Sequence, residues 1–235
     1  MVELATPDGP MRTFVAAPVG PARGGVVVVQ EAFGLNAHIE DVARRLAGVG
    51  YLAVAPELFH RSEDPGPFSY DDFAAVIPAM GGLSDHGMLV DVDVALSHLA
   101  DLGIGNERSG IVGFCMGGRV SFLVATRRTL GAAVGFYGSG IVNARFPQFP
   151  ALIDEVPTLA TPWLGLFGDR DGSIPVDDVA QLRAALSDAP VDAEVVRYAE
   201  ADHGFFCDLR PSYAADAAAD AWVRTLAWFE RLDGP

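Results

Sequence analysis

The sequence predicts a single α/β domain, residues 1–235, built on a mostly parallel, doubly wound sheet. Short β-branched runs such as Val26–Val29 alternate with segments that are apolar at helical spacing, and right-handed crossovers would join such strands in parallel. Residues 2–5 and 11–17 alternate weakly around a Pro-Asp-Gly turn, which predicts an antiparallel hairpin at the sheet edge. The chain of 235 residues, half of them apolar, is long enough to bury one core.

The elements follow one another along the chain after this hairpin. We expect strands at 26–29, 51–55, 111–114, 132–137, 163–167 and 193–198, the first two of them buried. Helical spacing of apolar residues predicts helices at 39–49, 87–102, 120–128, 175–186 and 213–232, the first of them capped by Asn36. Prolines and aromatic residues at 60–85 indicate a partly helical flap, and residues 141–161 indicate a loop with one short apolar turn.

Charge and residue usage exclude several classes of protein. The net charge of −15 leaves no basic surface for nucleic acid. All 16 basic residues are arginine, so Schiff-base chemistry, pyridoxal phosphate attachment and a lysine-bearing phosphate loop are excluded. The 2 cysteines do not make a disulfide framework, and the sequence contains neither an apolar run of spanning length nor a leader pattern. We expect a cytoplasmic monomer or small homo-oligomer that acts on a small molecule and binds neither nucleic acid nor membrane.

The segment Ile111–Arg119 has the pattern of a nucleophile elbow, a sharp turn between a strand and a helix that exposes one reactive side chain, here Cys115. A side chain at Gly113 or Gly117 would clash where the backbones approach closely. The helix start favours thiolate over thiol, because free N–H groups and the helix dipole face the sulfur. A buried structural cysteine beside a glycine turn is the alternative.

Polar residues follow four of the predicted strands at their carboxyl ends, where ligands bind in open parallel sheets: Glu31, Cys115, Asp169 with Asp171, and His203. A nucleophile, an acid and a histidine in this chain order are typical of a catalytic triad on such a sheet. His203 would take or hold the Cys115 proton, and a carboxylate would fix the histidine tautomer. We prefer Asp171 to Asp169, because Gly168-x-x-Asp171 places it in the loop beyond the strand tip.

The remaining ionisable residues are interpreted as structural. We expect no metal site and no cofactor, because the other histidines have no partner at metal-ligand spacing. Asp91 and Asp93 are interpreted as helix-start or solvated charges.

Five motifs resemble those of the dienelactone hydrolase family, in the same order and at compatible spacing over almost the whole chain: Gln30-Glu31-x-Phe33-Gly34-x-Asn36, Pro56-Glu57-Leu58-Phe59-x-Arg61, Gly113-Phe114-Cys115-Met116-Gly117-Gly118, Gly168-x-x-Asp171 and Asp202-His203-Gly204-Phe205. The resemblance implies an α/β-hydrolase fold with a triad of Cys115, His203 and Asp171, which opens cyclic enol esters in aromatic-degradation pathways. It also implies that Glu31 contacts the resting cysteine, is displaced by substrate and helps to take the thiol proton. A carboxylate that caps the following helix is the alternative role for Glu31. The family's oxyanion hole falls on the N–H groups of Ala32 and Met116.

Two departures from the family concern the substrate. Founding members bind a substrate carboxylate with arginines, one of them four residues after the histidine, where this chain has Cys207. Residues 62–90 contain no arginine. Arg210 is an alternative that could reach the pocket from further along the chain, but its spacing does not match that of the family. The pocket should therefore accept less acidic or more apolar esters and lactones, with an apolar lining expected from Phe33, Phe68, Tyr70, Tyr137 and Phe205.

These observations predict a hydrolase that opens a lactone, an enol-lactone or a small carboxylic ester through an acyl-cysteine intermediate. A broad-specificity carboxylesterase with the same triad is the close alternative. The alternative from another class is a non-hydrolytic protein that uses the pocket for binding, or Cys115 as a redox-sensitive thiol.

Overall fold

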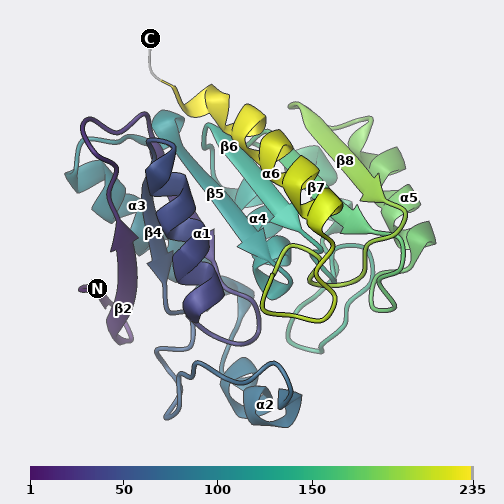
Figure 1. The fold of residues 1–235 in the computed structure, drawn as a ribbon, viewed down its shortest axis with the longest axis horizontal. Coiled ribbons are helices and arrows are strands. Elements are labelled where there is room, and N and C mark those ends of the chain that lie inside the picture. Colours follow the sequence, from purple (N-terminus) through teal and green to yellow (C-terminus); the bar gives the residue numbers. More distant parts are fainter. Residues whose placement is uncertain (234–235) are drawn as a thin grey trace.

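The structure, a computed structural model that describes residues 1–233, is organised around one eight-stranded sheet (Figure 1). The strand order is β1-β2-β4-β3-β5-β6-β7-β8. β2 runs antiparallel to both of its neighbours, and the other neighbouring strands run parallel. The predicted fold class, including the antiparallel hairpin at the edge, is confirmed. The strands are β1 Val2–Thr6, β2 Gly9–Ala16, β3 Gly25–Val29, β4 Leu52–Pro56, β5 Ser109–Phe114, β6 Ala132–Phe136, β7 Trp163–Gly168 and β8 Ala193–Tyr198.

Helices cover both faces of this sheet. α1 and α6 lie on one face, and α3, α4 and α5 lie on the other (Figure 1). The helices are α1 Ala37–Gly48, α2 Phe73–Gly81, α3 Asp85–Asp101, α4 Met116–Arg127, α5 Val176–Leu186 and α6 Ala215–Phe229, with short 3-10 helices at Asn106–Arg108, Ile153–Thr158 and Glu230–Leu232. The predicted elements therefore exist, and their ends differ by a few residues.

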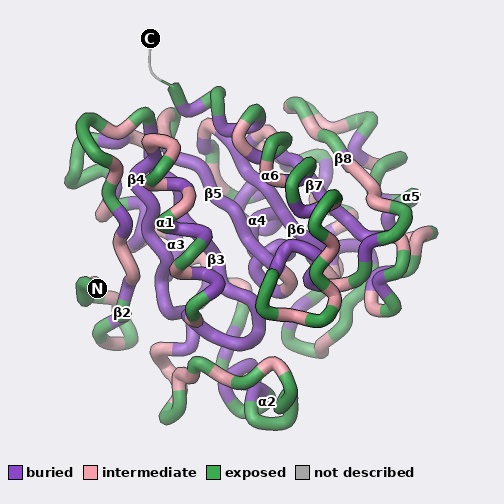
Figure 2. Tube along the Cα trace, in the orientation of Figure 1, coloured by how far each residue is buried: buried purple, intermediate pink, exposed green. Residues whose placement is uncertain are grey.

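The central strands are buried along their whole length, because helices pack on both of their faces. Every residue of β3, β5, β6 and β7 is buried (Figure 2). Two-sided burial explains why the sequence shows continuous apolar runs there, with no polar alternation. β8, at the edge of the sheet, is only partly buried.

The register of the parallel strands brings distant residues to one edge of the sheet. Val29 pairs with Gly113, so that Glu31 and Cys115 both follow this pair by two residues. Phe114 pairs with Phe136 on the next strand. The carboxyl end of β5, where the elbow lies, is thus flanked by the carboxyl ends of β3 and β6.

The segment 60–85 extends beyond this edge and contains α2, which lies apart from the main layers in Figure 1. The Asp72 carboxylate caps α2 by accepting a hydrogen bond from the Ala75 N–H at 3.2 Å. The prediction that this segment is partly helical is confirmed. Across residues 1–233 no single helix has the length and apolar character of a membrane span, and only α2 with α3, bent by 87°, passes such a test together by length and composition.

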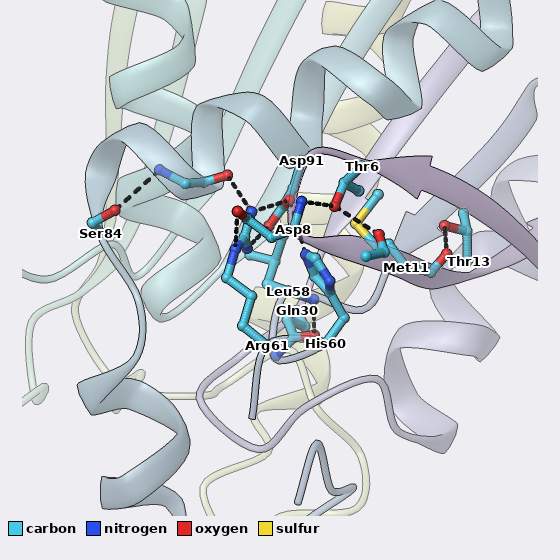
Figure 3. A network of polar contacts seen from close by, with 12 residues as sticks. Thr6, Asp8, Met11, Thr13, Gln30, Leu58, His60, Arg61, Ser84 and Asp91 are labelled. Carbon is cyan, nitrogen blue, oxygen red and sulfur yellow. Dashed lines mark hydrogen bonds and ion pairs between the residues drawn. The ribbon is translucent and has the colours of Figure 1, made fainter. Parts of the chain in front are cut away.

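A buried polar network holds the start of this segment against the sheet (Figure 3). Asp91 is 0% exposed, and its carboxylate accepts hydrogen bonds from Arg61 at 2.7 and 2.8 Å and lies 3.1 Å from His60 Nε2. Arg61 also donates to Asp8, in the turn of the β1–β2 hairpin, at 2.7 Å. The interpretation of Asp91 as a helix-start or solvated charge is therefore wrong, because Asp91 is buried inside α3. The sequence did not indicate this, because its partners Arg61 and His60 belong to a segment that is distant in sequence.

Candidate active site

Cys115 stands on a strained turn between β5 and α4. Its φ of 54° and ψ of −114° lie outside the regions that residues with a side chain normally occupy. A Cβ atom on Gly113 would lie 1.8 Å from the Gly117 carbonyl oxygen, and one on Gly117 would lie 2.5 Å from the Val29 carbonyl oxygen. The predicted steric reason for both glycines is confirmed, because only a bare backbone lets α4 begin this close to the sheet.

The start of α4 leaves backbone donors near the Cys115 sulfur. Within residues 1–233 neither the Met116 nor the Ala32 N–H donates to another backbone group in the loops and turns. Cys115 occupies the cap position of this 12-residue helix and makes no side-chain cap hydrogen bond. The positive end of the helix therefore faces the position where a thiolate or an oxyanion would carry its charge.

His203 and Asp171 form a hydrogen-bonded pair at the same edge of the sheet. Asp171 Oδ2 lies 2.6 Å from His203 Nδ1, and the Asp171 side chain is 1% exposed. Asp169 points elsewhere, and its carboxylate accepts hydrogen bonds from Arg197 at 2.6 and 2.8 Å. The structure thus places Asp171, the aspartate that the loop spacing favours, beside His203.

Ser173 is a further member of this group, which the sequence interpretation missed. Asp171 Oδ1 accepts hydrogen bonds from the Ser173 N–H at 2.8 Å and from its Oγ at 2.6 Å. Burial alone would raise the pKa of Asp171, but the hydrogen bonds and charge of His203, together with those from Ser173, lower it below its usual value. The Asp-x-Ser spacing, typical of a side chain that bonds to the backbone two residues on, could have indicated this contact.

The pKa of His203 is raised to about 10 by its neighbours. Burial lowers it, whereas the charge of a Cys115 thiolate, a hydrogen bond with that sulfur and the Asp171 carboxylate all raise it. His203 Nδ1 faces Asp171, and His203 and Cys115 line the same cavity. Together these neighbours favour the protonated form of the imidazole.

Glu31 is 0% exposed and pairs with Arg210, whose Nη1 lies 3.2 Å from Oε1. Its other oxygen, Oε2, is buried without a hydrogen-bond partner among residues 1–233. Helix α1 is capped by Asn36, whose Oδ1 accepts from the Ile39 N–H at 3.2 Å, as predicted. Glu31 is thus not the cap of that helix, and Arg210 reaches it although the sequence spacing indicated no such partner.

Aromatic rings surround the Arg210 guanidinium. Its central carbon lies 5.7 Å from the centre of the Phe33 ring and 5.3 Å from the centre of the Tyr70 ring. A Cβ atom on Gly204, the residue after His203, would lie 2.4 Å from Arg210 Nη1. The glycine of the Asp-His-Gly motif therefore leaves the space that Arg210 needs to approach Glu31.

A cavity of about 470 Å³ opens beside Cys115, His203 and Asp171. Its apolar wall includes Phe73 and Met80 from the flap and Phe146 and Phe149 from the loop after β6. Arg119 and Arg145 are the cations at its wall within residues 1–233. Arg119 is 3% exposed and is neutralised by Asp85, at 2.6 and 3.0 Å.

This lining differs from the expected one. Phe33, Phe68, Tyr70, Tyr137 and Phe205 lie outside the wall of the cavity. The Tyr137 ring packs edge-on against His203 at 5.1 Å, Phe205 packs behind it at 5.4 Å, and Phe68 packs on Phe59 at 6.0 Å. Phe33 and Tyr70 pack against the Arg210 guanidinium, and the cavity wall comes instead from segments whose position depends on long-range packing.

No group of three or more His, Cys, Asp or Glu side chains within residues 1–233 is placed to hold a metal ion. Cys207, the other free cysteine, is 0% exposed and donates to the Tyr70 hydroxyl at 3.4 Å. Its side chain therefore packs beside the Glu31–Arg210 pair.

The sheet order, the strained elbow at the carboxyl end of a central strand, and an acid and a histidine on later loops define an α/β-hydrolase fold.

Comparison with known proteins narrows this class. The model of the dienelactone hydrolase family matches residues 11–232. A protein of Escherichia coli (strain K12) named as a carboxymethylenebutenolidase is 42% identical over 216 residues, 89% of this chain and 77% of that protein. One of the same name from Synechocystis sp. is 36% identical over 227 residues, 92% of this chain and 90% of that one. A crystal structure from Klebsiella pneumoniae subsp. pneumoniae, described as a dienelactone hydrolase, superposes with a TM-score of 0.88 at 40% identity over 97% of each chain. The chain therefore belongs to the dienelactone hydrolase family, and its class of activity is carboxylic ester hydrolysis.

Proposed function

We propose that the protein hydrolyses a lactone, an enol-lactone or a small carboxylic ester through an acyl-cysteine intermediate. The observation that carries the proposal is the contact between Asp171 Oδ2 and His203 Nδ1, at 2.6 Å, on the wall of the cavity that also contains Cys115. An oriented histidine beside a cysteine on a helix N-terminus is the arrangement that activates a thiol.

In the first half-reaction the Cys115 sulfur attacks the carbonyl carbon as a thiolate, whose proton His203 holds. Negative charge develops on the carbonyl oxygen, which accepts hydrogen bonds from the Ala32 and Met116 N–H groups, worth about 3–4 kcal/mol per donor. The carbon–oxygen bond then breaks, and His203 gives the proton to the leaving oxygen. The result is a thioester on Cys115 and a free alcohol, or a tethered hydroxyl when the substrate is a lactone.

In the second half-reaction His203 takes a proton from water, and the hydroxide attacks the thioester carbon. The bond to sulfur breaks, and the carboxylic acid product leaves. Asp171 keeps the Nδ1 proton of His203 in place in both steps and stabilises the imidazolium.

Glu31 is the second group proposed to act on the thiol. Its Oε2 is buried and unpartnered among residues 1–233, while Oε1 is held by Arg210 at 3.2 Å. A substrate that draws Arg210 away would leave the Glu31 carboxylate free to help take the thiol proton.

The apolar wall of the cavity favours esters with an apolar acyl or alcohol group. It also keeps the broad-specificity carboxylesterase as a second candidate, because Cys207 replaces the arginine that founding members of the family carry. Degradation of aromatic compounds in the cytoplasm is the setting that we propose for the narrower, lactone-opening function.

The decisive experiment measures hydrolysis of p-nitrophenyl acetate by the wild type and by Cys115→Ala, with intact-protein mass spectrometry of the quenched reaction. We expect turnover and an acetyl adduct on Cys115 in the wild type, and neither in the variant. Turnover retained in Cys115→Ala would refute the nucleophile. A panel of dienelactone, simple lactones and aryl esters, compared by kcat/KM, separates the lactone enzyme from the generalist, and no turnover of any of them would favour a binding or redox-thiol role.

A further inference from the structure

The loop that follows β7 places a serine hydroxyl directly on the acid of the proposed triad. The two oxygens of Asp171 have separate partners: Oδ2 lies 2.6 Å from His203 Nδ1, and Oδ1 accepts from the N–H and Oγ of Ser173 at 2.8 and 2.6 Å. Rotation of the carboxylate about its bond to Cβ would break bonds at both oxygens. The carboxylate plane is therefore determined by Ser173 as well as by His203.

The same hydroxyl also lies 3.2 Å from His203 Nδ1. Its proton is committed to Asp171 Oδ1, so toward the histidine Oγ presents a lone pair. This contact is longer than the one to Asp171 Oδ2 and shares the Nδ1 proton with it. The arrangement is consistent only with a proton on Nδ1, which leaves Nε2 to face the Cys115 sulfur.

We propose that Ser173 is a positioning residue for hydrolysis, acting through Asp171 to hold the carboxylate ionised and aligned with His203. The proposal rests on the proposed function, because it assigns Ser173 to the same triad. Asp171 is 1% exposed, and a carboxylate this far from water stays charged only with donors on its oxygens. Ser173 supplies two of them, and the hydroxyl is the one that a substitution can remove.

A second contact ties Ser173 to the substrate side of the site. Its carbonyl oxygen accepts a hydrogen bond from Arg145 Nη1 at 2.7 Å, and both residues belong to the cavity wall. Ser173 could therefore contact substrate directly instead of acting through Asp171. The test has to separate these two roles.

The test compares Ser173→Ala, Ser173→Thr and, as a matched control, Ser187→Ala, whose hydroxyl bonds to Ala184 O at 2.7 Å on the exposed end of α5. In Ser173→Ala we expect kcat/KM for p-nitrophenyl acetate to fall about tenfold, mainly through kcat, since one hydrogen bond to a charged group is lost. The acidic limb of the pH profile should move to higher pH, because Asp171 loses a donor to its charged form. Threonine keeps the hydroxyl and should restore both, and Ser187→Ala should match the wild type.

A double-mutant cycle with Asp171→Ala distinguishes the two roles. If Ser173 acts through the carboxylate, adding Ser173→Ala to Asp171→Ala should change kcat/KM little. A loss as large as in the wild-type background, or a loss confined to KM, would overturn the proposal, as would wild-type kinetics in a folded Ser173→Ala. Should Ser173→Ala not fold, failure of Ser173→Thr to keep the wild-type pH profile would overturn it. Activity retained by Cys115→Ala would instead refute the proposed function, so the two failures are distinguishable.

Discussion

Replacing Asp171 by asparagine should impair hydrolysis far more than replacing Asp169, although only Arg170 separates the two carboxylates. An asparagine has one side-chain oxygen, and the two donors of Ser173 would hold it at the position of Oδ1. The amide NH2 would then face His203 Nδ1 and require Nδ1 to accept. The histidine proton would move to Nε2, and this tautomer cannot take the Cys115 proton.

The size of the effect follows from these contacts. The wrong histidine tautomer costs a serine-protease triad about 10⁴-fold in kcat. A cysteine is the better nucleophile and depends less on its base, so we expect a fall in kcat/KM of about 10²- to 10⁴-fold, or about 3–5 kcal/mol. Asp169 makes a partly exposed ion pair with Arg197. Asp169→Asn should lower the free energy of unfolding by at most about 1 kcal/mol and leave kcat/KM close to that of the wild type.

The assay is the initial rate of p-nitrophenolate release from p-nitrophenyl acetate at neutral pH. Urea unfolding of each variant confirms that the compared proteins are folded. Wild-type kcat/KM in Asp171→Asn, or a larger loss in Asp169→Asn, would show that the acid has been assigned to the wrong aspartate.

Further variants test the elbow, the anchor of the flap and the electrostatics of the histidine. Gly117→Ala should lower the free energy of unfolding by about 1–3 kcal/mol, since its Cβ would meet the Val29 carbonyl oxygen at 2.5 Å. The control Gly48→Ala, whose Cβ would meet nothing within 4 Å, should raise it by about 0.4–1 kcal/mol. Equal urea midpoints for the two variants would contradict this expectation. Asp91→Ala should lower the free energy of unfolding by about 3 kcal/mol, because it leaves the side chains of Arg61 and His60 without their buried partner. Asp93→Ala breaks a partly exposed ion pair with Arg128 and should lower it by less than about 1 kcal/mol. A similar loss in both variants would argue against the buried anchor. The pKa of His203, about 10 in the wild type, should fall in Cys115→Ala, because burial lowers it and the sulfur that raises it is gone. An unchanged imidazole titration by NMR would contradict the contact between the two side chains.

The pKa shifts of His203 and Asp171 determine whether the free energy of unfolding rises or falls with pH. The pKa of His203 is raised, so its stabilising contribution is complete below the ordinary histidine pKa and is lost as the pH rises toward about 10. The pKa of Asp171 is lowered, so its contribution is complete above the ordinary aspartate pKa and is lost as the pH falls through the lowered value. Urea midpoints of the wild type and Asp171→Asn should therefore converge in acid, and a difference that persists there would contradict the linkage.

Local signals in the sequence determined most of the fold. Burial on both faces favours continuous apolar runs such as Val26–Val29, and the cap of α1 lies directly before the helix, so β3 and Asn36 could be recognised without their partners. The elbow is equally local, since the clash of Gly113 with Gly117 arises between residues of one turn. For this reason Cys115 could be identified from its own neighbours.

Contacts between distant segments were decided only by the tertiary structure. Arg210 reaches Glu31 across 179 residues. Asp91, in α3, pairs with Arg61 and His60 from the segment that follows β4. The wall of the cavity likewise depends on how the flap and the loop after β6 pack over the sheet edge. Sequence patterns report the periodicity and the conformation of a short segment, whereas a charge pair or a cavity wall depends on where independent segments meet in space.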